Sequence, residues 1–335
     1  MKKSLIALAV AGVVSAPAFA ATSNVDVYGK LHVSVSAFND QEAGVEDMQV
    51  SSNASRIGFK GSEDLGGGLA AIWQIETGVN MDETGGTWAN RNTFVGLKSD
   101  AMGTLMIGNY DTPLKLIGRN IDLFGDTLAD SRNVTAGLSD TRGRNSVTYM
   151  SPSFSGLAFA AQYSNSAEFN ATSANNGDLA DDSFWSLNGT YTNGPLFVGL
   201  GYSDGDALEA GGVDKEWRLS AGYSFGDFKV VGQYDKLKSE FSNDDYRAWL
   251  LGGAYTMGNV VLKANYMDGE WDGFNGDIKQ WTIGADYNLS KRTTVYALYA
   301  DGENIGFGFG AGGSDRIGPD NEDVSVFSVG VVHSF

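Results

Sequence analysis

The sequence predicts an all-β fold: a transmembrane antiparallel β-barrel of sixteen strands with a long constriction loop folded into its lumen. Three observations support this prediction. Segments of about ten residues alternate apolar and polar side chains, which is the period of a strand. After the first twenty residues no stretch approaches the roughly 18 apolar residues of a membrane-spanning helix. The final segment, Val324–Phe335, is an apolar strand whose edge needs a partner inside a bilayer.

The first twenty residues predict a cleaved signal peptide, which leaves 21–335 as a single barrel domain. Lys2 and Lys3 form a short basic region, and an apolar run follows that is too short to span a membrane. Ala18-Phe19-Ala20 matches the small-residue pattern of a cleavage site. We therefore expect an exported protein.

The composition fits a barrel with a polar lumen. The 335 residues include 45 Gly and 5 Pro, and the mean hydropathy is near neutral because the two faces of each strand average out. The chain has 0 Cys, which excludes a disulfide framework and a thiolate metal site. A formal net charge of -18 argues against nucleic acid as a partner.

Sixteen alternating segments can be placed along the chain, separated in turn by short turns and long polar loops. The expected strands are 25–36, 55–64, 69–78, 91–100, 103–110, 145–151, 157–165, 184–192, 196–203, 215–225, 227–238, 246–256, 259–268, 279–288, 292–301 and 324–335. The stretch 37–54 is expected to be a long loop. An even strand number is typical of bacterial barrels, and sixteen strands leave an aqueous channel.

The strand around Trp217 shows the pattern most clearly. Trp217, Leu219, Ala221, Tyr223 and Phe225 fall on one face, and polar side chains fall on the other. Aromatic residues recur near the ends of several segments, which is typical of the girdles of membrane barrels. A soluble β-sandwich also alternates, but the outward aromatics and the asymmetry of turns and loops favour the membrane barrel.

The longest internal loop, 111–144, is the strongest candidate for a functional segment. It contains five acids and five bases beside a set of apolar residues that is unusual for a free surface loop. We expect it to enter the lumen, bury Leu123 and Phe124 against the wall, and present its acids to the pore. Inward-facing bases of the wall would lie opposite.

No motif for catalysis or cofactor binding stands out. Gly308–Gly313 matches G-x-G-x-x-G but lies in an acidic loop, without the strand and helix of a nucleotide site. The 2 histidines, His32 and His333, lack a third ligand for zinc. We expect no enzyme activity, no catalytic residues, no metal and no cofactor.

Acidic residues concentrate in the long loops. The ordinary interpretation is a solvated surface. A more specific hypothesis is that divalent cations bridge these carboxylates to anionic lipid headgroups at the cell surface.

Several motifs resemble those of the general trimeric porins of the Gram-negative outer membrane. The resemblance lies in Asp26–Lys30, Ser55–Gly61, Arg91–Lys98, Phe124-Gly125-Asp126, Arg144-Asn145-Ser146 and the ending Val329–Phe335. It covers the whole mature chain. It implies a porin for passive diffusion of ions and small hydrophilic solutes; the alternative is a channel selective for a sugar or an anion.

The resemblance also implies a site and partners. Lys30, Arg56 and Arg91 match the basic cluster of the family's constriction, Asp122 and Asp126 supply loop acids, and Arg132 or Arg142 completes the basic wall. Leu123 stands where the enterobacterial pattern has an acid, so the sign of ion selectivity stays open. The implied partners are a second and third copy of the chain in a homotrimer, outer-membrane lipid and lipopolysaccharide, and the permeating solutes.

Overall fold

The computed structural model describes residues 24–40, 48–84, 86–135, 140–167, 183–205, 213–239, 245–272, 277–305 and 323–335. The expected signal peptide at 1–20 and the glycine-rich motif at 308–313 lie outside the described residues. Most of the acids in the long loops also lie outside them.

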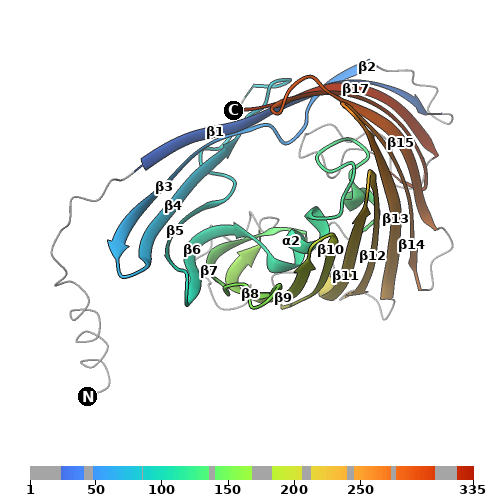
Figure 1. Ribbon diagram of the computed structural model, residues 1–335. Helices are drawn as coiled ribbons and strands as arrows, with labels where there is room; N and C mark the ends of the chain where they lie inside the picture. Colours follow the sequence, from blue (N-terminus) through green and yellow to red (C-terminus); the bar gives the residue numbers. More distant parts are fainter. Residues whose placement is uncertain are drawn as a thin grey trace.

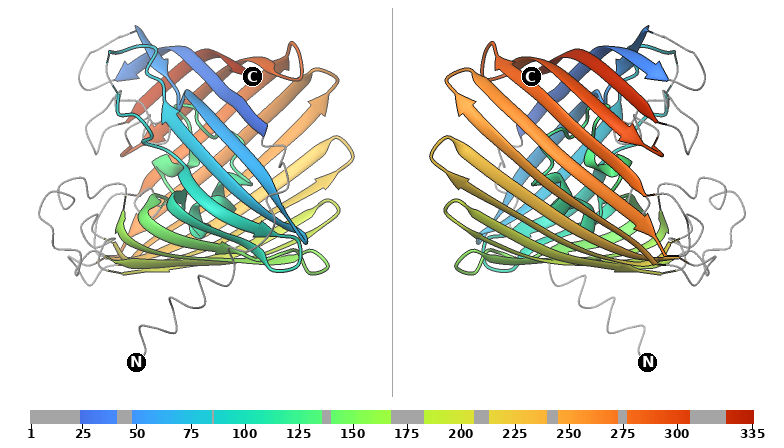
Figure 2. Two further views of the ribbon diagram at one scale, coloured as in Figure 1. Left: turned by 90° about the vertical axis from the view of Figure 1, so that its left-hand side faces the viewer. Right: turned by 90° about the vertical axis from the view of Figure 1, so that its right-hand side faces the viewer.

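The described strands form one closed antiparallel barrel, drawn as a ring in Figure 1 and with strongly tilted strands in Figure 2. Each strand from β3 onward pairs with the next along the chain, and the ring closes where β1 pairs with β17 in a register from Lys30 opposite Ser334 to Asp40 opposite Val324. The strands are β1 (Asn24–Asp40), β2 (Met48–Ser52), β3 (Arg56–Gly66), β4 (Leu69–Gly78), β5 (Thr93–Ser99), β6 (Gly103–Asp111), β7 (Arg142–Met150), β8 (Leu157–Ala167), β9 (Phe184–Asn193), β10 (Leu196–Asp204), β11 (Val213–Phe225), β12 (Phe228–Ser239), β13 (Asp245–Met257), β14 (Val260–Trp271), β15 (Ile278–Asn288), β16 (Thr293–Glu303) and β17 (Val324–Ser334).

These bounds confirm the predicted sixteen-strand barrel, with two corrections. The strand expected at 145–151 begins at Arg142, so the end of the predicted loop 111–144 belongs to the wall. The second correction concerns the first long loop. The stretch 37–54 was expected to be a loop, but β1 continues to Asp40 and β2 occupies Met48–Ser52. β2 pairs with the second half of β1 and β3 pairs with its first half, so β2 and β3 together make one interrupted barrel strand. The interruption is stabilised by Asn53, whose amide donates to Ser34 Oγ at 2.7 Å. Alternation alone does not reveal this strand, because Met48–Ser52 has only five residues.

The outer surface of the barrel is apolar. Trp217, Leu219, Tyr223 and Phe225 are exposed there, as their alternation predicts. Aromatic pairs gather towards both ends of the strands: Trp249 with Tyr266 near the loops, and Phe228 with Tyr255 near the short turns. Rings at these depths suit the two lipid headgroup regions. Among the described residues, no helix is long and apolar enough to cross a membrane.

The loop between β6 and β7 lies inside the ring, as predicted (Figure 1). It begins with helix α2 (Pro113–Arg119), whose start is capped by the Thr112 hydroxyl accepting from the Lys115 backbone N–H. The helix packs on β9 and β10. A Cβ at Gly199 would lie 2.8 Å from the Ile117 side chain, so the wall needs glycine where the helix rests.

Two apolar contacts hold the rest of the loop against the wall. Ile121 packs in a cluster with side chains of β12 and β13, and Phe124 packs in a second cluster with Tyr296 and Leu298 of β16. Phe124 is buried as expected, and the partly buried Leu123 contacts both clusters. The loop is thus attached to the wall on two sides of the lumen.

Candidate pore constriction

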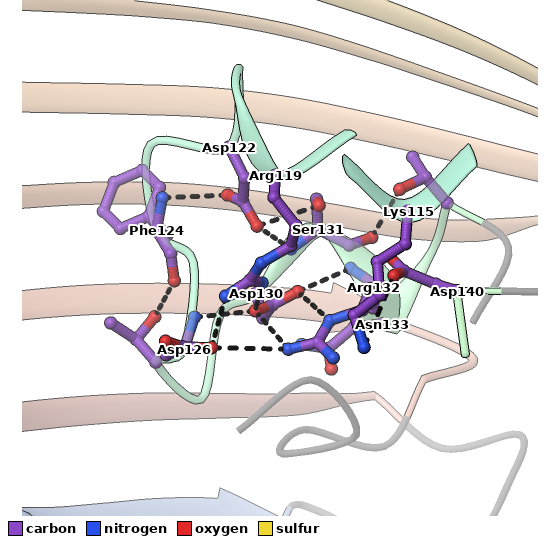
Figure 3. A network of polar contacts seen from close by, with 12 residues as sticks. Lys115, Arg119, Asp122, Phe124, Asp126, Asp130, Ser131, Arg132, Asn133 and Asp140 are labelled. Carbon is purple, nitrogen blue, oxygen red and sulfur yellow. Dashed lines mark hydrogen bonds and ion pairs between the residues drawn. The ribbon is translucent and has the colours of Figure 1, made fainter. Parts of the chain in front are cut away.

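Asp126, at the tip of the loop, is the central acid of the candidate constriction. Its Oδ2 atom lies 2.5 Å from Nζ of Lys30 on β1 and 3.5 Å from Nη1 of Arg56 on β3. On the loop side its carboxylate pairs with Arg119 and lies 3.6 Å from Nη2 of Arg132. One carboxylate therefore joins two bases of the wall to two bases of the loop, and Figure 3 shows the loop side with Arg119 and Arg132.

Asp130 and Asp122 fix the shape of the loop behind this tip. Asp130 accepts from the backbone N–H of Asp126 at 2.7 Å and pairs with Arg119 at 2.8 Å and Arg132 at 2.9 Å. Asp122 accepts from the backbone N–H groups of Phe124 and Ser131 (Figure 3). These bonds hold Asp126 in a left-handed backbone conformation with φ of 62°, which is unfavourable for a residue with a side chain.

The wall beside Arg56 carries a second acid, Glu76 on β4. Its Oε1 atom accepts from Nε of Arg91 at 2.7 Å, and its Oε2 atom accepts from the Tyr28 hydroxyl at 2.9 Å. Oε2 also lies 3.9 Å from Nε of Arg56. Glu76 thus orients both arginines along one stretch of wall.

The bases of this region reach the lumen further than the acids do. The side chains of Arg119, Arg56 and Lys30 are 27%, 25% and 18% exposed. Those of Asp126, Glu76 and Asp130 are 9%, 7% and 0% exposed. The acids orient the bases from behind, so the surface that a solute meets is mainly cationic.

The base of the loop is held by a separate ionic network. Arg218 on β11 is fully buried, donates from Nε to Asp235 at 2.5 Å, and lies 3.1 Å from Glu216 and 3.6 Å from Asp140. Its Nη2 also donates to the Thr135 backbone carbonyl at 3.3 Å. Since Thr135 and Asp140 belong to the loop, this guanidinium ties the loop to β11 and β12.

A further wall lysine supports the loop from the opposite side. Lys263 on β14 donates to the Leu123 carbonyl at 2.9 Å, pairs with Asp286 at 2.9 Å, and lies 4.7 Å from the centre of the Phe124 ring. A cation at this distance from an aromatic face is attracted to it. The loop tip is therefore bound to β1 and β3 by Asp126 and to β14 by its backbone.

Asp126 and Asp122 have pKa values that are shifted in opposite directions. Burial raises the pKa of Asp126, but the charges of Arg119, Lys30 and Arg56 outweigh that effect and keep the pKa well below its usual value. Burial and the neighbouring Asp130 raise the pKa of Asp122 to about 6. Asp126 therefore stays charged at neutral pH, whereas Asp122 titrates near neutrality.

The structure brings together some of the residues chosen from the sequence and separates others. Lys30, Arg56 and Asp126 meet at the loop tip, with Arg91 beside them. Asp122 turns into the loop, and Arg132 reaches the tip through Asp130. Arg142, the first residue of β7, has its Nε atom 3.2 Å from Asp111, and its charge acts directly on Arg91, so it extends the row of wall bases. Four further residues of the site were not chosen from the sequence: Glu76, Arg119, Lys263 and Arg218. Alternation places three of them, Glu76, Lys263 and Arg218, on the inward face, but it does not show which residues they contact.

His32 and His333 have different surroundings, although they lie on the neighbouring strands β1 and β17. His32 faces inward and its Nε2 lies 2.9 Å from the Tyr296 hydroxyl. His333 is exposed and its Nδ1 lies 2.9 Å from Thr293 Oγ1. Among the described residues, no group of three or more histidines and acids has a metal-binding arrangement.

A closed barrel with an apolar outer belt and an inward loop defines a pore-type protein of the bacterial outer membrane. The chain belongs to the Gram-negative porin family, whose model matches residues 7–306. Together with the apolar belt, this membership places the protein in the outer membrane of a Gram-negative cell. The family and its structural neighbours are porins rather than enzymes.

Similar proteins of known sequence come from Neisseria. The major outer membrane protein P.IB of Neisseria gonorrhoeae is 37% identical over 173 residues, which cover 49% of this chain and 48% of that protein. The P.IB protein of Neisseria meningitidis serogroup B is 34% identical over 216 residues, covering 60% of this chain and 58% of that protein. The chain thus spans about half the length of these relatives.

Solved porin structures match nearly the whole chain. The anion-selective porin from Comamonas acidovorans has a TM-score of 0.78 and 25% identity, with 93% of this chain and 100% of that chain covered. OmpT of Vibrio cholerae, in a trimer form, has a TM-score of 0.69 and 20% identity, with 93% and 99% covered. The second likeness supports the fold alone.

Proposed function

We propose that the protein forms a water-filled channel for passive diffusion of ions and small hydrophilic solutes across the outer membrane, with no catalytic step. The observation that carries the proposal is the meeting of Lys30, Arg56 and Asp126 inside a closed polar barrel. The loop sets the width of the passage, and the fixed charges around Asp126 and Glu76 create a local field that orients polar solutes. We assign the constriction to Lys30, Arg56, Arg91, Asp122, Asp126, Arg132 and Arg142, with Glu76 and Arg119 added.

Single-channel recording in a planar bilayer tests the channel. Folded, purified protein should give stable conductance steps in KCl that do not saturate when neutral sugars are added. Folded barrels that insert without any conductance would contradict the proposal.

A preference for anions is the second function that a specific observation favours. The exposed charges at the constriction are the bases, and the acids lie behind them. A structural neighbour with 25% identity is an anion-selective porin. A sugar channel would need aromatic faces along the lumen, but the inward Tyr296 is buried and bonded to His32. A reversal potential of the sign expected for chloride permeation in a KCl gradient supports anion preference, and the opposite sign contradicts it.

We expect the chain to act as a homotrimer and to contact outer-membrane lipid and lipopolysaccharide. The exposed apolar residues of β1 and β5, such as Val25, Val27 and Val95, offer a surface for neighbouring copies or lipid. The structurally similar OmpT of Vibrio cholerae has been solved in a trimer form. Native mass spectrometry of outer-membrane extracts would give the copy number, and sequencing of the mature N-terminus would test cleavage after Ala20.

A further inference from the structure

A cavity of about 360 Å³ lies inside the barrel, between the loop and the wall, away from the charged tip. The loop contributes Asn120 and Ile121, directly after α2. The wall contributes Phe197 of β10, Ser224 of β11 and Lys229 of β12. Pro195 and Lys229 lie close to short turns, so the cavity opens toward the turn side of the lumen. None of its lining residues belongs to the constriction.

The cavity has one polar side with a free positive charge. Lys229 faces inward, because it alternates with the outward Phe228 and Val230 and pairs in register with Ser224. Lys263, two strands away, is neutralised by Asp286. Lys229, by contrast, has no ion-pair partner among the described residues, and no carboxylate lines the cavity. The hydroxyls of Thr192 and Ser224 add hydrogen-bond donors to the lining, whereas the Thr190 hydroxyl donates to the Ala158 carbonyl at 3.5 Å.

The opposite side of the cavity is apolar. Ile121 and Phe197 supply hydrocarbon surface, and Gly222 forms part of the floor. A Cβ at Gly222 would lie 3.7 Å from both Ile121 and Val231, which is ordinary contact. Packing of the loop therefore does not demand glycine here, unlike at Gly199. The absent side chain leaves the cavity open.

We propose that this cavity binds small organic anions that carry an apolar body, such as an aromatic carboxylate. The carboxylate pairs with Lys229 and the wall hydroxyls, and the ring packs on Ile121 and Phe197. The volume is at the small end of ligand sites, which limits the ligand to roughly the size of benzoate or cinnamate. A single accessible charge and a small ring give a dissociation constant on the order of 1 mM. The inference rests on the proposed channel, since the cavity is reached through the lumen.

Current block by benzoate tests the site. Benzoate added to the turn side of single channels in KCl should reduce the current in a saturable manner. Acetate has the charge without the ring, and benzyl alcohol has the ring without the charge; both should have little effect at the same concentration. Equal block by acetate and benzoate would overturn the proposal.

Three variants separate the cavity from general lumen charge. Lys229→Gln removes the charge that pairs with the carboxylate, and Gly222→Leu fills the space that the ring occupies, so each should raise the half-blocking concentration about tenfold. Lys98→Gln is the matched control, because Lys98 is also an exposed inward lysine near a short turn but lies on β5. Equal effects of Lys229→Gln and Lys98→Gln would contradict the site.

Benzoate binding to the folded protein in detergent, measured by saturation-transfer NMR, gives a readout that does not need conduction. At one benzoate concentration near the wild-type dissociation constant, the signal should be similar for the wild type and the Lys98→Gln variant and much weaker for Lys229→Gln. Failure of the channel proposal would appear as no KCl conductance. Failure of the binding proposal alone would appear as normal KCl conductance without selective benzoate block or binding.

Discussion

Nζ of Lys30 lies 2.5 Å from Oδ2 of Asp126, and this ion pair joins the first barrel strand to the tip of a loop 96 residues later. Lys30 also lies in the part of β1 that pairs with both β3 and β17. The loop tip is thereby fixed to the seam where the barrel closes. The Lys30–Asp126 ion pair therefore links the closure of the barrel to the position of the constriction loop.

Replacing Asp126 with Asn should strengthen anion preference. The change removes the negative charge that faces Lys30, Arg56 and Arg119, while all three bases stay in place. The reversal potential in a KCl gradient should shift further toward the chloride value, and the current should become noisier because the loop tip is less firmly held. Asp26→Asn is the control, since Asp26 is exposed and lies opposite Lys60 away from the tip. Equal shifts in both variants would contradict a special role for Asp126.

Neutralising Arg56 and Arg91 together should move permeability toward cations. Both guanidinium groups are partly exposed, and their loss leaves Glu76 and Asp126 with less compensation. The double variant Arg56→Gln with Arg91→Gln should shift the reversal potential toward the potassium value, while Lys98→Gln should have a smaller effect. An unchanged reversal potential would refute the placement of these arginines at the constriction.

The strands could be predicted because lipid and water impose a period of two on every spanning segment. The bounds of β4 match the sequence prediction at both ends, and the inward and outward sides of β11 were also correct. The short β2 was missed because a five-residue strand carries too little alternation. Its pairing with β1 depends on a break at Asn53 that local pattern does not reveal.

The candidate site was less predictable. The ion-pair partners of a charged loop residue depend on the path of the loop through the lumen, and alternation does not give that path. The predicted loop 111–144 contains five acids and five bases, and the sequence does not show which acid contacts the wall. Asp122 binds the backbone of its own loop, whereas Asp126 contacts the wall four residues later. The anchoring of the loop base by Arg218 depends on contacts with Thr135 and Asp140, both far away in sequence.

Replacing Arg218 with Met should loosen the loop and destabilise the barrel. The guanidinium is buried among Asp235, Glu216 and Asp140, and its removal leaves Asp235 and Glu216 without their cation. Breaking a buried pair by removing one partner costs about 3–5 kcal/mol. The variant should unfold at a lower temperature in heat-modifiability gels. Arg247→Met is the matched control, because Arg247 pairs with Glu270 and Asp272 at the exposed rim; similar losses in both would argue against the anchoring role.

The attachment of the loop should weaken between acid and neutral pH. The pKa of Asp122 is raised in the folded loop to about 6, so the folded state binds this proton more tightly than the unfolded chain does. The stabilisation is complete below the ordinary aspartate pKa of about 4 and is lost as pH rises through about 6. Open-channel noise should therefore be greater at about pH 7.5 than at about pH 5, and Asp122→Asn should remove most of this dependence. Noise that falls as pH rises would contradict the assignment.

Barrel closure should depend on the contact between Gly29 and Phe335. Each donates its backbone N–H to the carbonyl of the other, at 3.0 and 3.1 Å, and the Phe335 ring covers Gly29 so closely that a Cβ there would lie 2.4 Å from its Cζ atom. Deleting Phe335 removes both hydrogen bonds and the ring. Gly29→Val keeps the chain length, displaces the ring and also crowds the Arg56 backbone carbonyl, which would lie 2.8 Å from the new Cβ. Both variants should lower the yield of folded barrel in the outer membrane, with Gly29→Val less severe. Gly253→Val is the control, because the nearest atom to a Cβ there is 3.7 Å away. A normal yield of folded trimer without Phe335 would show that the seam closes by strand pairing alone.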